Sequence, residues 1–170
     1  MTAPRPLRPG DKIAVSSKFV LFLLALLWAA ASLAGEKDML GILTREQILQ
    51  GCPGWDAVAA AYVPAPDPIA RLKEFARPVQ VEVFLGSWCS DSKLQVPAFI
   101  KVLDALGSPL ISVTYIGVPH DKEARPDYYE GKDIQRIPTF IVSVDGLEKG
   151  RIVESPAKSI EQDLVDILSR

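Results

Sequence analysis

The sequence predicts an α/β fold in which helices flank a central mixed sheet of about four strands. Two apolar segments, 79–85 and 110–118, are typical of buried strands, and a helix-length segment separates them. This order predicts a parallel pair of strands joined by a right-handed crossover. An Asp-Gly pair at 145–146 is typical of a hairpin turn and joins two further strands, 139–144 and 150–154. We therefore expect a three-layer sandwich of helix, sheet and helix.

Composition limits the classes of partner and cofactor. The chain has 170 residues, 48% of them hydrophobic, which is enough for the core of one ordinary domain. Its 19 basic and 21 acidic side chains show no basic excess, so the composition does not favour nucleic acid as a partner. The two cysteines and one histidine are widely spaced, which argues against a zinc site. We expect a monomer that uses no metal and no cofactor.

The first 34 residues have the pattern of an export signal. A basic, proline-containing segment precedes an uncharged, leucine-rich run at 19–34, which ends in small residues. A helix of this length spans about 24 Å, less than the ~30 Å hydrocarbon core of a bilayer. We expect a cleaved secretory signal, with retention of residues 1–34 as an N-terminal membrane anchor as the alternative. Either case places the rest of the chain in the periplasm or outside the cell, where disulfides persist.

The segment 35–66 is expected to be a helical extension that precedes the main domain. Thr44 and Gln47 have the spacing of a capping box, which predicts the start of a helix. A Gly-Cys-Pro-Gly turn at 51–54 must end that helix, and a second helix is predicted from Trp55 to Tyr62. The aromatic residues at the two ends of this second helix lie on one face, so we expect them to pack the extension onto the main domain.

The main domain is predicted to span residues 67–170. Asp67 is expected to cap its first helix, which follows a proline-rich linker. A longer helix is predicted from Ser90 to Leu106, between the two parallel strands. A last amphipathic helix is expected to open at Ser155-Pro156, because proline is favoured in a first helical turn.

Cys89 lies where the first strand of the main domain gives way to the helix from Ser90 to Leu106. The first N–H groups of a helix have no backbone partner, and the helix dipole places partial positive charge there. Thiols at helix N-termini therefore ionise well below the ~8.5 of a free thiol, and the thiolate is the nucleophile. This position makes Cys89 the candidate nucleophile, with a buried structural thiol as the alternative.

The Trp-Cys-x-x-Ser-Lys motif at 88–93, followed by Pro97, resembles the active-site turn and helix of the thioredoxin superfamily. The resemblance implies a thioredoxin-like domain in which Cys89, beside Trp88, attacks disulfides or mixed disulfides. Ser92 stands in the place of the second cysteine of the usual motif. A serine can donate a hydrogen bond to the thiolate, but it cannot resolve a mixed disulfide, so resolution needs a second thiol.

A second motif, Ile137-Pro138-Thr139, resembles the cis-proline loop of the same superfamily. In that family the loop packs against the active-site cysteine. The resemblance implies a cis peptide bond before Pro138 and a substrate groove that Ile137 and Thr139 help to form. Backbone groups of Ile137 would then pair with an extended substrate. An ordinary turn proline is the alternative.

Three further side chains are candidates for thiol chemistry. Glu82 is an acid within a core strand, where it either transfers protons or is a carboxylate at the strand edge or paired with a lysine. Asp91 lies in the first turn of the helix, where it either complements the dipole or faces Cys89. Cys52 is a candidate remote resolving thiol, with a free or intermolecular cysteine as the alternative.

Together these patterns favour an exported, single-cysteine thiol–disulfide oxidoreductase. Its expected partners are proteins or low-molecular-weight thiols and disulfides, and its only expected membrane contact is an uncleaved segment 19–34. A non-catalytic binding module with the same fold is the alternative, because a fold does not by itself fix a function.

Overall fold

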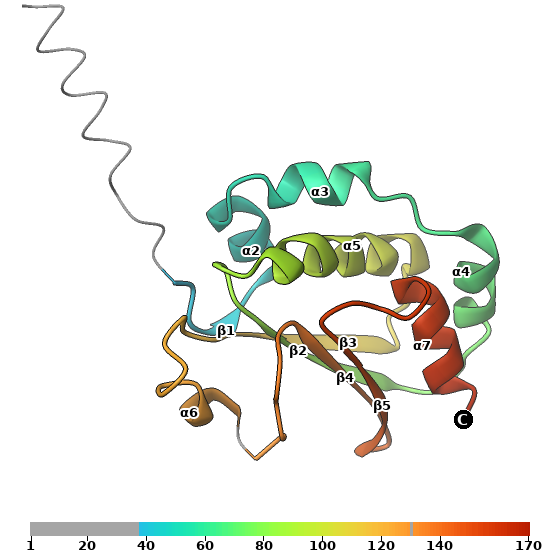
Figure 1. Cartoon of the computed structure of the whole chain (residues 1–170). Coiled ribbons are helices and arrows are strands. Elements are labelled where there is room, and N and C mark those ends of the chain that lie inside the picture. The colour runs from blue at the N-terminus through green and yellow to red at the C-terminus, as the bar shows by residue number, and fades with distance from the viewer. Residues whose placement is uncertain (1–37, 130) are drawn as a thin grey trace, which may run out of the picture. The chain divides into compact units, whose positions relative to one another are not determined.

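The computed structural model describes residues 38–129 and 131–170, which belong to one compact unit from Asp38 to Arg170 (Figure 1). The signal or anchor predicted at 1–34, including the apolar run 19–34, lies outside the described residues. Within the described part of the chain, every helix is too short or too polar to cross a bilayer.

A five-stranded mixed sheet forms the centre of this unit, with the strand order β1-β3-β2-β4-β5. The strands are β1 (Gly41–Leu43), β2 (Val79–Leu85), β3 (Ile111–Gly117), β4 (Thr139–Val144) and β5 (Leu147–Val153). β2 and β3 are parallel, and β4 and β5 form the hairpin across the Asp-Gly turn. The predicted parallel pair and hairpin are therefore confirmed, and so is the mixed α/β character of the fold.

β1 corrects two expectations: that the extension is helical throughout, and that the sheet has about four strands. This short strand pairs antiparallel with the end of β3, so that Gly41 lies opposite Gly117. A Cβ atom at Gly117 would lie 2.1 Å from the carbonyl oxygen of Met39, so only glycine permits this approach of the two backbones. Leu43 is buried, while Ile42 is 80% exposed. Three residues are too few for such alternation to be recognised in a sequence.

Six helices accompany the sheet in the described residues. They are α2 (Arg45–Gly51), α3 (Trp55–Ala61), α4 (Pro66–Lys73), α5 (Ser90–Leu106), α6 (Pro126–Tyr129) and α7 (Ile160–Leu168). The capping box at the start of α2 is confirmed, with both of its hydrogen bonds present. Two predicted starts are wrong. α4 begins at Pro66 after Ala65, because proline is itself favoured in the first turn, and α7 begins after Ser159, whose hydroxyl accepts the Gln162 N–H.

The helices are divided unequally between the two faces of the sheet (Figure 1). Five of them, α2, α3, α4, α5 and α7, lie on one face, while α6, a single turn, lies on the other. The expected sandwich of helix, sheet and helix thus has one thick and one thin helical layer. We call the two sides the thick face and the thin face.

Each face has its own apolar cluster. On the thick face, alternate residues of β2 from Val79 to Leu85 pack against α5, including Phe99. Burial of each such side chain contributes roughly 1.5–3 kcal/mol. The smaller cluster, on the thin face, consists of five buried residues: Phe84, Val118, Ile134, Ile137 and Ile141. Trp88 and Cys89 pack against this smaller cluster, so the candidate nucleophile lies beside the less covered part of the sheet.

The extension is built into the thick face. Trp55 of α3 is only 2% exposed and belongs to the main core, which confirms its expected packing role. Beyond α3, the Tyr62 hydroxyl and the Ala65 N–H both donate to the carboxylate of Glu161 in α7, at 2.7 and 2.9 Å. Burial alone would raise the pKa of Glu161, but these hydrogen bonds outweigh burial and hold its pKa below the usual range. The extension and the C-terminal helix therefore share a buried, hydrogen-bonded carboxylate.

Candidate active site

The turn between β2 and α5 places Cys89 at the N-cap of α5. The Cys89 N–H donates to the Gly86 carbonyl at 3.0 Å, and the Lys93 N–H donates to the Cys89 carbonyl at 3.0 Å. Cys89 itself has extended backbone geometry and is half-buried. Cys89 is therefore the N-cap of a 17-residue helix, as the sequence predicts, although its side chain makes no capping hydrogen bond.

The thiol of Cys89 faces the loop that precedes β4. Its Sγ donates to the carbonyl oxygen of Ile137 at 3.5 Å. The Ile137–Pro138 peptide bond is cis, as predicted. Thr139 is buried, and its hydroxyl donates to the Arg136 carbonyl at 2.6 Å, so its side chain supports the loop from within. The two motifs recognised in the sequence thus meet at one place.

Ser92 closes the turn on its inner side. It is fully buried, and its Oγ accepts the Gly86 N–H at 3.2 Å. No hydrogen bond joins Ser92 to Cys89 among those recorded for the described residues. A hydroxyl that accepts one bond still has its own hydrogen to donate. The expected bond from Ser92 to a thiolate therefore stays a prediction.

Trp88 lies between two loops. Its Nε1 donates to the Val118 carbonyl at 3.2 Å. The His120 ring packs edge to face against the indole, with 4.7 Å between the ring centroids. The Arg125 guanidinium lies 4.6 Å from the centroid of the Trp88 ring. A Cβ atom on Gly86 would come within 2.7 Å of the Trp88 ring and 3.0 Å of Ile137. Glycine at position 86 is therefore needed for Trp88 to lie this close to the cis-proline loop.

The segment before β1 braces the loops on either side of Trp88. The Met39 N–H donates to the Ser87 hydroxyl at 3.2 Å, and Asp38 accepts the His120 N–H at 2.7 Å. No sequence pattern indicates these contacts, because each joins residues at least 48 positions apart.

Cys52 is in the thick-face core. It is 1% exposed, and its Sγ lies 3.3 Å from the Met39 Sδ. A buried thiol of this kind could resolve a mixed disulfide on Cys89 only after local opening of the extension. Its placement gives no support to the remote resolving role.

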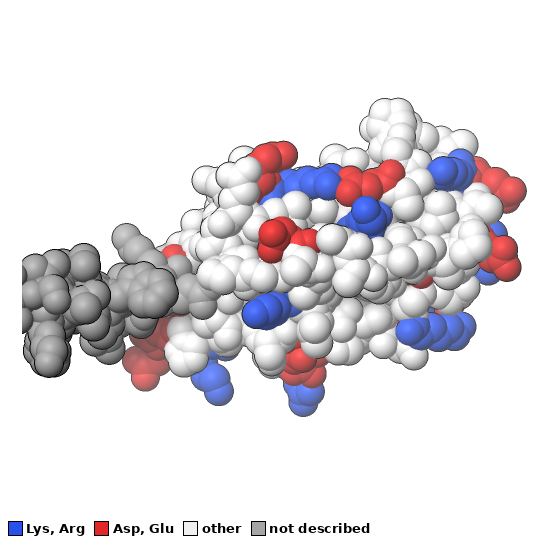
Figure 2. Space-filling model, turned by 90° about the horizontal axis from the view of Figure 1, so that it is seen from above, with Lys and Arg blue, Asp and Glu red and all other residues white. Residues whose placement is uncertain are grey.

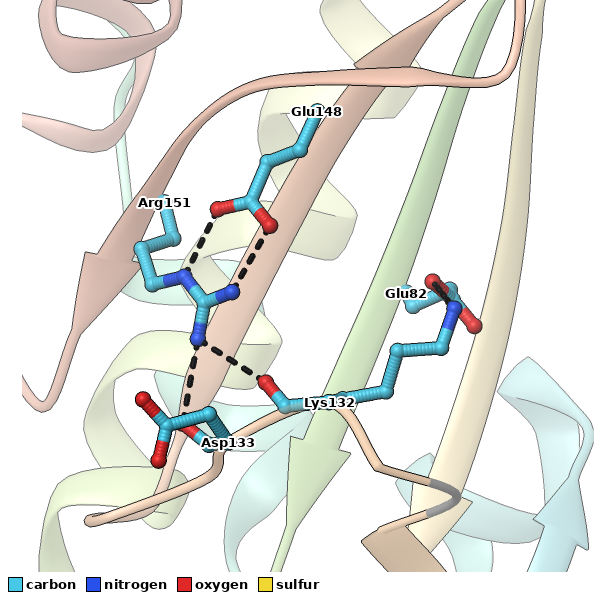
Figure 3. Close-up of polar contacts among 5 residues, drawn as sticks. All are labelled: Glu82, Lys132, Asp133, Glu148 and Arg151. Carbon is cyan, nitrogen blue, oxygen red and sulfur yellow. Dashed lines mark hydrogen bonds and ion pairs between the residues drawn. The ribbon is translucent and has the colours of Figure 1, made fainter.

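Glu82 is paired with a lysine on the thin face (Figure 3). Its Oε2 accepts from Lys132 Nζ at 2.8 Å, which is the alternative to proton transfer that the sequence left open. Arg151 donates to the backbone carbonyls of Lys132 and Asp133 at 3.1 and 3.2 Å. The same guanidinium forms a bidentate ion pair with the carboxylate of Glu148. The hydrogen bond from Arg151 holds the pKa of Glu148 below its usual range. These contacts fix the start of the cis-proline loop on β2 and β5.

Charge elsewhere gives little indication of a ligand. Asp91 lies half-buried in the first turn of α5, where a carboxylate complements the helix dipole. Over the thick face, Lys and Arg are interspersed with Asp and Glu, and no area of one sign dominates (Figure 2). Across residues 38–129 and 131–170, His, Cys, Asp and Glu form no group of three that could hold a metal ion.

The family of the chain follows from a protein-family model described as Thioredoxin, which matches residues 54–166, more than half of the sequence. The chain belongs to this thioredoxin family. The matched part contains both the Cys89 turn and the cis-proline loop. Membership supports a redox role for this thioredoxin-fold protein.

Two solved structures share the thioredoxin-family fold of this chain. A protein of unknown function from Pseudomonas aeruginosa is 17% identical, with a TM-score of 0.57 over 76% of this chain and 90% of its own. A scaffold that carries an HIV epitope is 18% identical, with a TM-score of 0.53 over 76% of this chain and 83% of its own. At these identities the likeness concerns the fold alone. No curated protein matches the chain with significance.

Proposed function

We propose that this thioredoxin-family chain exchanges thiols and disulfides through one cysteine, Cys89. The observation that carries the proposal is the meeting of three features at one sulfur. Cys89 caps a long helix, its Sγ touches the Ile137 carbonyl, and the next peptide bond, to Pro138, is cis. Helix N-termini favour the thiolate, and Cys89 is only half-buried.

The proposed reaction is a direct displacement at sulfur. The Cys89 thiolate attacks one sulfur of a disulfide, the old S–S bond breaks, and the other sulfur leaves as a thiolate with the bonding electron pair. The product is a mixed disulfide between Cys89 and one half of the substrate. Ser92 and the helix N-terminus stabilise the thiolate, and Trp88 and Ile137 border the groove where the substrate lies.

Resolution of the mixed disulfide comes from outside the site. Ser92 has no thiol, and Cys52 is buried beneath Met39. The second thiol therefore belongs to the substrate protein or to a low-molecular-weight thiol. One cysteine cannot give up two electrons by closing an internal disulfide, so isomerisation or removal of thiol adducts suits this site better than net reduction. Export through the segment 1–34, cleaved or retained as an anchor, would place the chain where such substrates occur.

A binding module is the second candidate, and one observation favours it. Glu82, the acid nearest in sequence before the cysteine, is engaged by Lys132, so this carboxylate is not free to assist proton transfer at Cys89. In that case the groove beside Pro138 would hold a partner chain without exchange of sulfur.

Thiol–disulfide exchange at Cys89 with oxidised glutathione separates the two candidates. The folded full chain is incubated with oxidised glutathione and the mixed disulfide is followed by mass spectrometry, with Cys89→Ser as the blank and Cys52→Ala as the test of the buried thiol. We expect one glutathione to add to the wild-type chain and to Cys52→Ala, and a second thiol to remove it. An adduct that forms only after unfolding would support the binding module instead.

A further inference from the structure

Arg125 is held in one orientation beside the candidate nucleophile. Its Nε donates to the Pro119 carbonyl at 3.0 Å, and its Nη2 donates to the His120 carbonyl at 2.8 Å. The guanidinium lies over the Trp88 ring, 4.6 Å from its centroid. Three contacts from two directions therefore fix a side chain that on most surfaces is free to rotate.

This guanidinium has unused donors. An arginine has five N–H groups, and two backbone carbonyls account for two of them. The ion pairs recorded among the described residues do not include Arg125. Asp121 accepts the Glu123 N–H at 3.0 Å, and Asp38 accepts the N–H of His120, the residue whose carbonyl binds Arg125. Donors on Nη1 and Nη2 thus remain available to an incoming acceptor.

The position of Arg125 relates these donors to the reacting sulfur. Trp88 immediately precedes Cys89. The side chains of Trp88 and Ile137 both pack against the backbone of Gly86. Arg125 therefore lies against the residue that adjoins Cys89, while the Ile137 carbonyl meets the Cys89 thiol from the cis-proline loop. A rigid guanidinium with parallel free N–H groups matches a carboxylate in charge and in geometry.

We propose that Arg125 determines specificity and selects disulfides that carry a carboxylate near the reacting sulfur. The inference rests on the proposed function, because it concerns which disulfides Cys89 attacks. The Cys89 thiolate displaces one half of the substrate as a thiolate, and the half that joins Cys89 keeps its carboxylate on Arg125. Arg125 touches the bound substrate and takes no part in the transfer of electrons.

The test is a series of small disulfides that differ in charge. Second-order rates are measured at low ionic strength for the full chain with dianionic dithiobis(nitrobenzoate), neutral dithiodipyridine and cationic cystamine, with Cys89→Ser as the blank. Each variant is compared with the wild-type chain for each disulfide, so the intrinsic reactivities of the three reagents cancel. Arg77→Gln is the matched control, since Arg77 loses the same charge at the far end of β2, where it pairs with Asp145.

Arg125→Gln is expected to lower the rate with the anionic disulfide about fivefold, because this is the size of effect that loss of one attractive charge has in partly solvated surroundings. The neutral disulfide should react within about twofold of wild type, cystamine should not be slowed, and added salt should reduce the effect. Arg125→Lys keeps the positive charge but cannot form the paired hydrogen bonds of a guanidinium, so it should give an intermediate rate with dithiobis(nitrobenzoate). Arg77→Gln should change none of the three rates.

Two results would overturn the inference while leaving the proposed function intact. In one, Arg125→Gln slows all three disulfides by the same factor, so that the arginine only supports Trp88. In the other, Arg77→Gln slows the anionic disulfide as much as Arg125→Gln does. A wild-type chain that reacts with none of the three disulfides would instead contradict the proposed function itself.

Discussion

The two faces of the sheet differ in how they are held together. The thick face is covered by five helices and holds the main core, including Trp55 from the extension. The thin face has a cluster of five buried residues, a single turn of helix, and a loop fixed by Lys132 and Arg151. The loops that surround Cys89 belong largely to the thin face. Apolar burial thus stabilises one side, while hydrogen bonds and ion pairs position the side where the chemistry is proposed.

The largest effect on stability is expected from Trp55→Ala on the thick face. Trp55 is almost fully buried, and removing a buried indole costs about 3–5 kcal/mol of unfolding free energy. Urea denaturation followed by circular dichroism measures the change. Ile42→Ala, at an exposed position, is the control and should change stability by less than about 0.5 kcal/mol. Equal effects would show that the extension adds nothing to the core.

Glu161→Gln should have a smaller, pH-dependent effect. The variant loses charge-assisted hydrogen bonds from Tyr62 and Ala65, which we expect to cost about 1–3 kcal/mol at pH 7. Because the pKa of Glu161 is lower in the folded chain, its contribution is present above the unfolded value of ~4.3 and is lost as the pH falls through the folded pKa.

Denaturation curves at a series of pH values test this sign. The difference in stability between wild type and Glu161→Gln should shrink steadily as the pH falls below about 4. Tyr62→Phe is the matched variant, because it keeps the carboxylate and removes one donor. A difference that stays constant down to low pH would mean that Glu161 is already protonated in the folded chain.

The smallest effect on stability is expected on the thin face, from Lys132→Met. The side chains of Lys132 and Glu82 are 38% and 30% exposed, so solvent screens their pairing and its removal should cost less than about 1 kcal/mol. The rate of Cys89 alkylation should nevertheless change, because Lys132 holds the loop that leads to Ile137. Lys158→Met, which breaks an exposed pair with Asp166 on α7, is the control and should leave that rate unchanged. A loss of several kcal/mol in Lys132→Met would contradict the contrast between the faces.

Local patterns explain why much of the fold could be predicted. β2, β3 and the hairpin have apolar runs or turn residues that the sequence displays directly, and the Thr44 capping box needs only four residues. β1 could not be found in this way, because it depends on the close approach of Met39 to Gly117, far along the chain. The unequal helical layers were missed for a similar reason: amphipathic helices show that they are half-buried, but not on which face.

The residues of the candidate site likewise fall into those that the sequence predicts and those that it does not. Cys89 and Pro138 could be recognised because their neighbours in sequence form motifs, and the structure brings them together. His120 and Arg125 carry no such pattern, and their relation to Trp88 arises only when the loop after β3 folds over it. Residues that modify a site from another loop are thus harder to predict than the residue that reacts.

The contact between the Cys89 thiol and the Ile137 carbonyl gives one oxygen two tasks. The oxygen accepts the thiol at 3.5 Å, and under the proposed function an extended substrate would pair with the same carbonyl, as in strand addition. A substrate docked there would lie next to the sulfur that it reacts with. The group that recognises the substrate backbone would therefore also set its distance from the nucleophile.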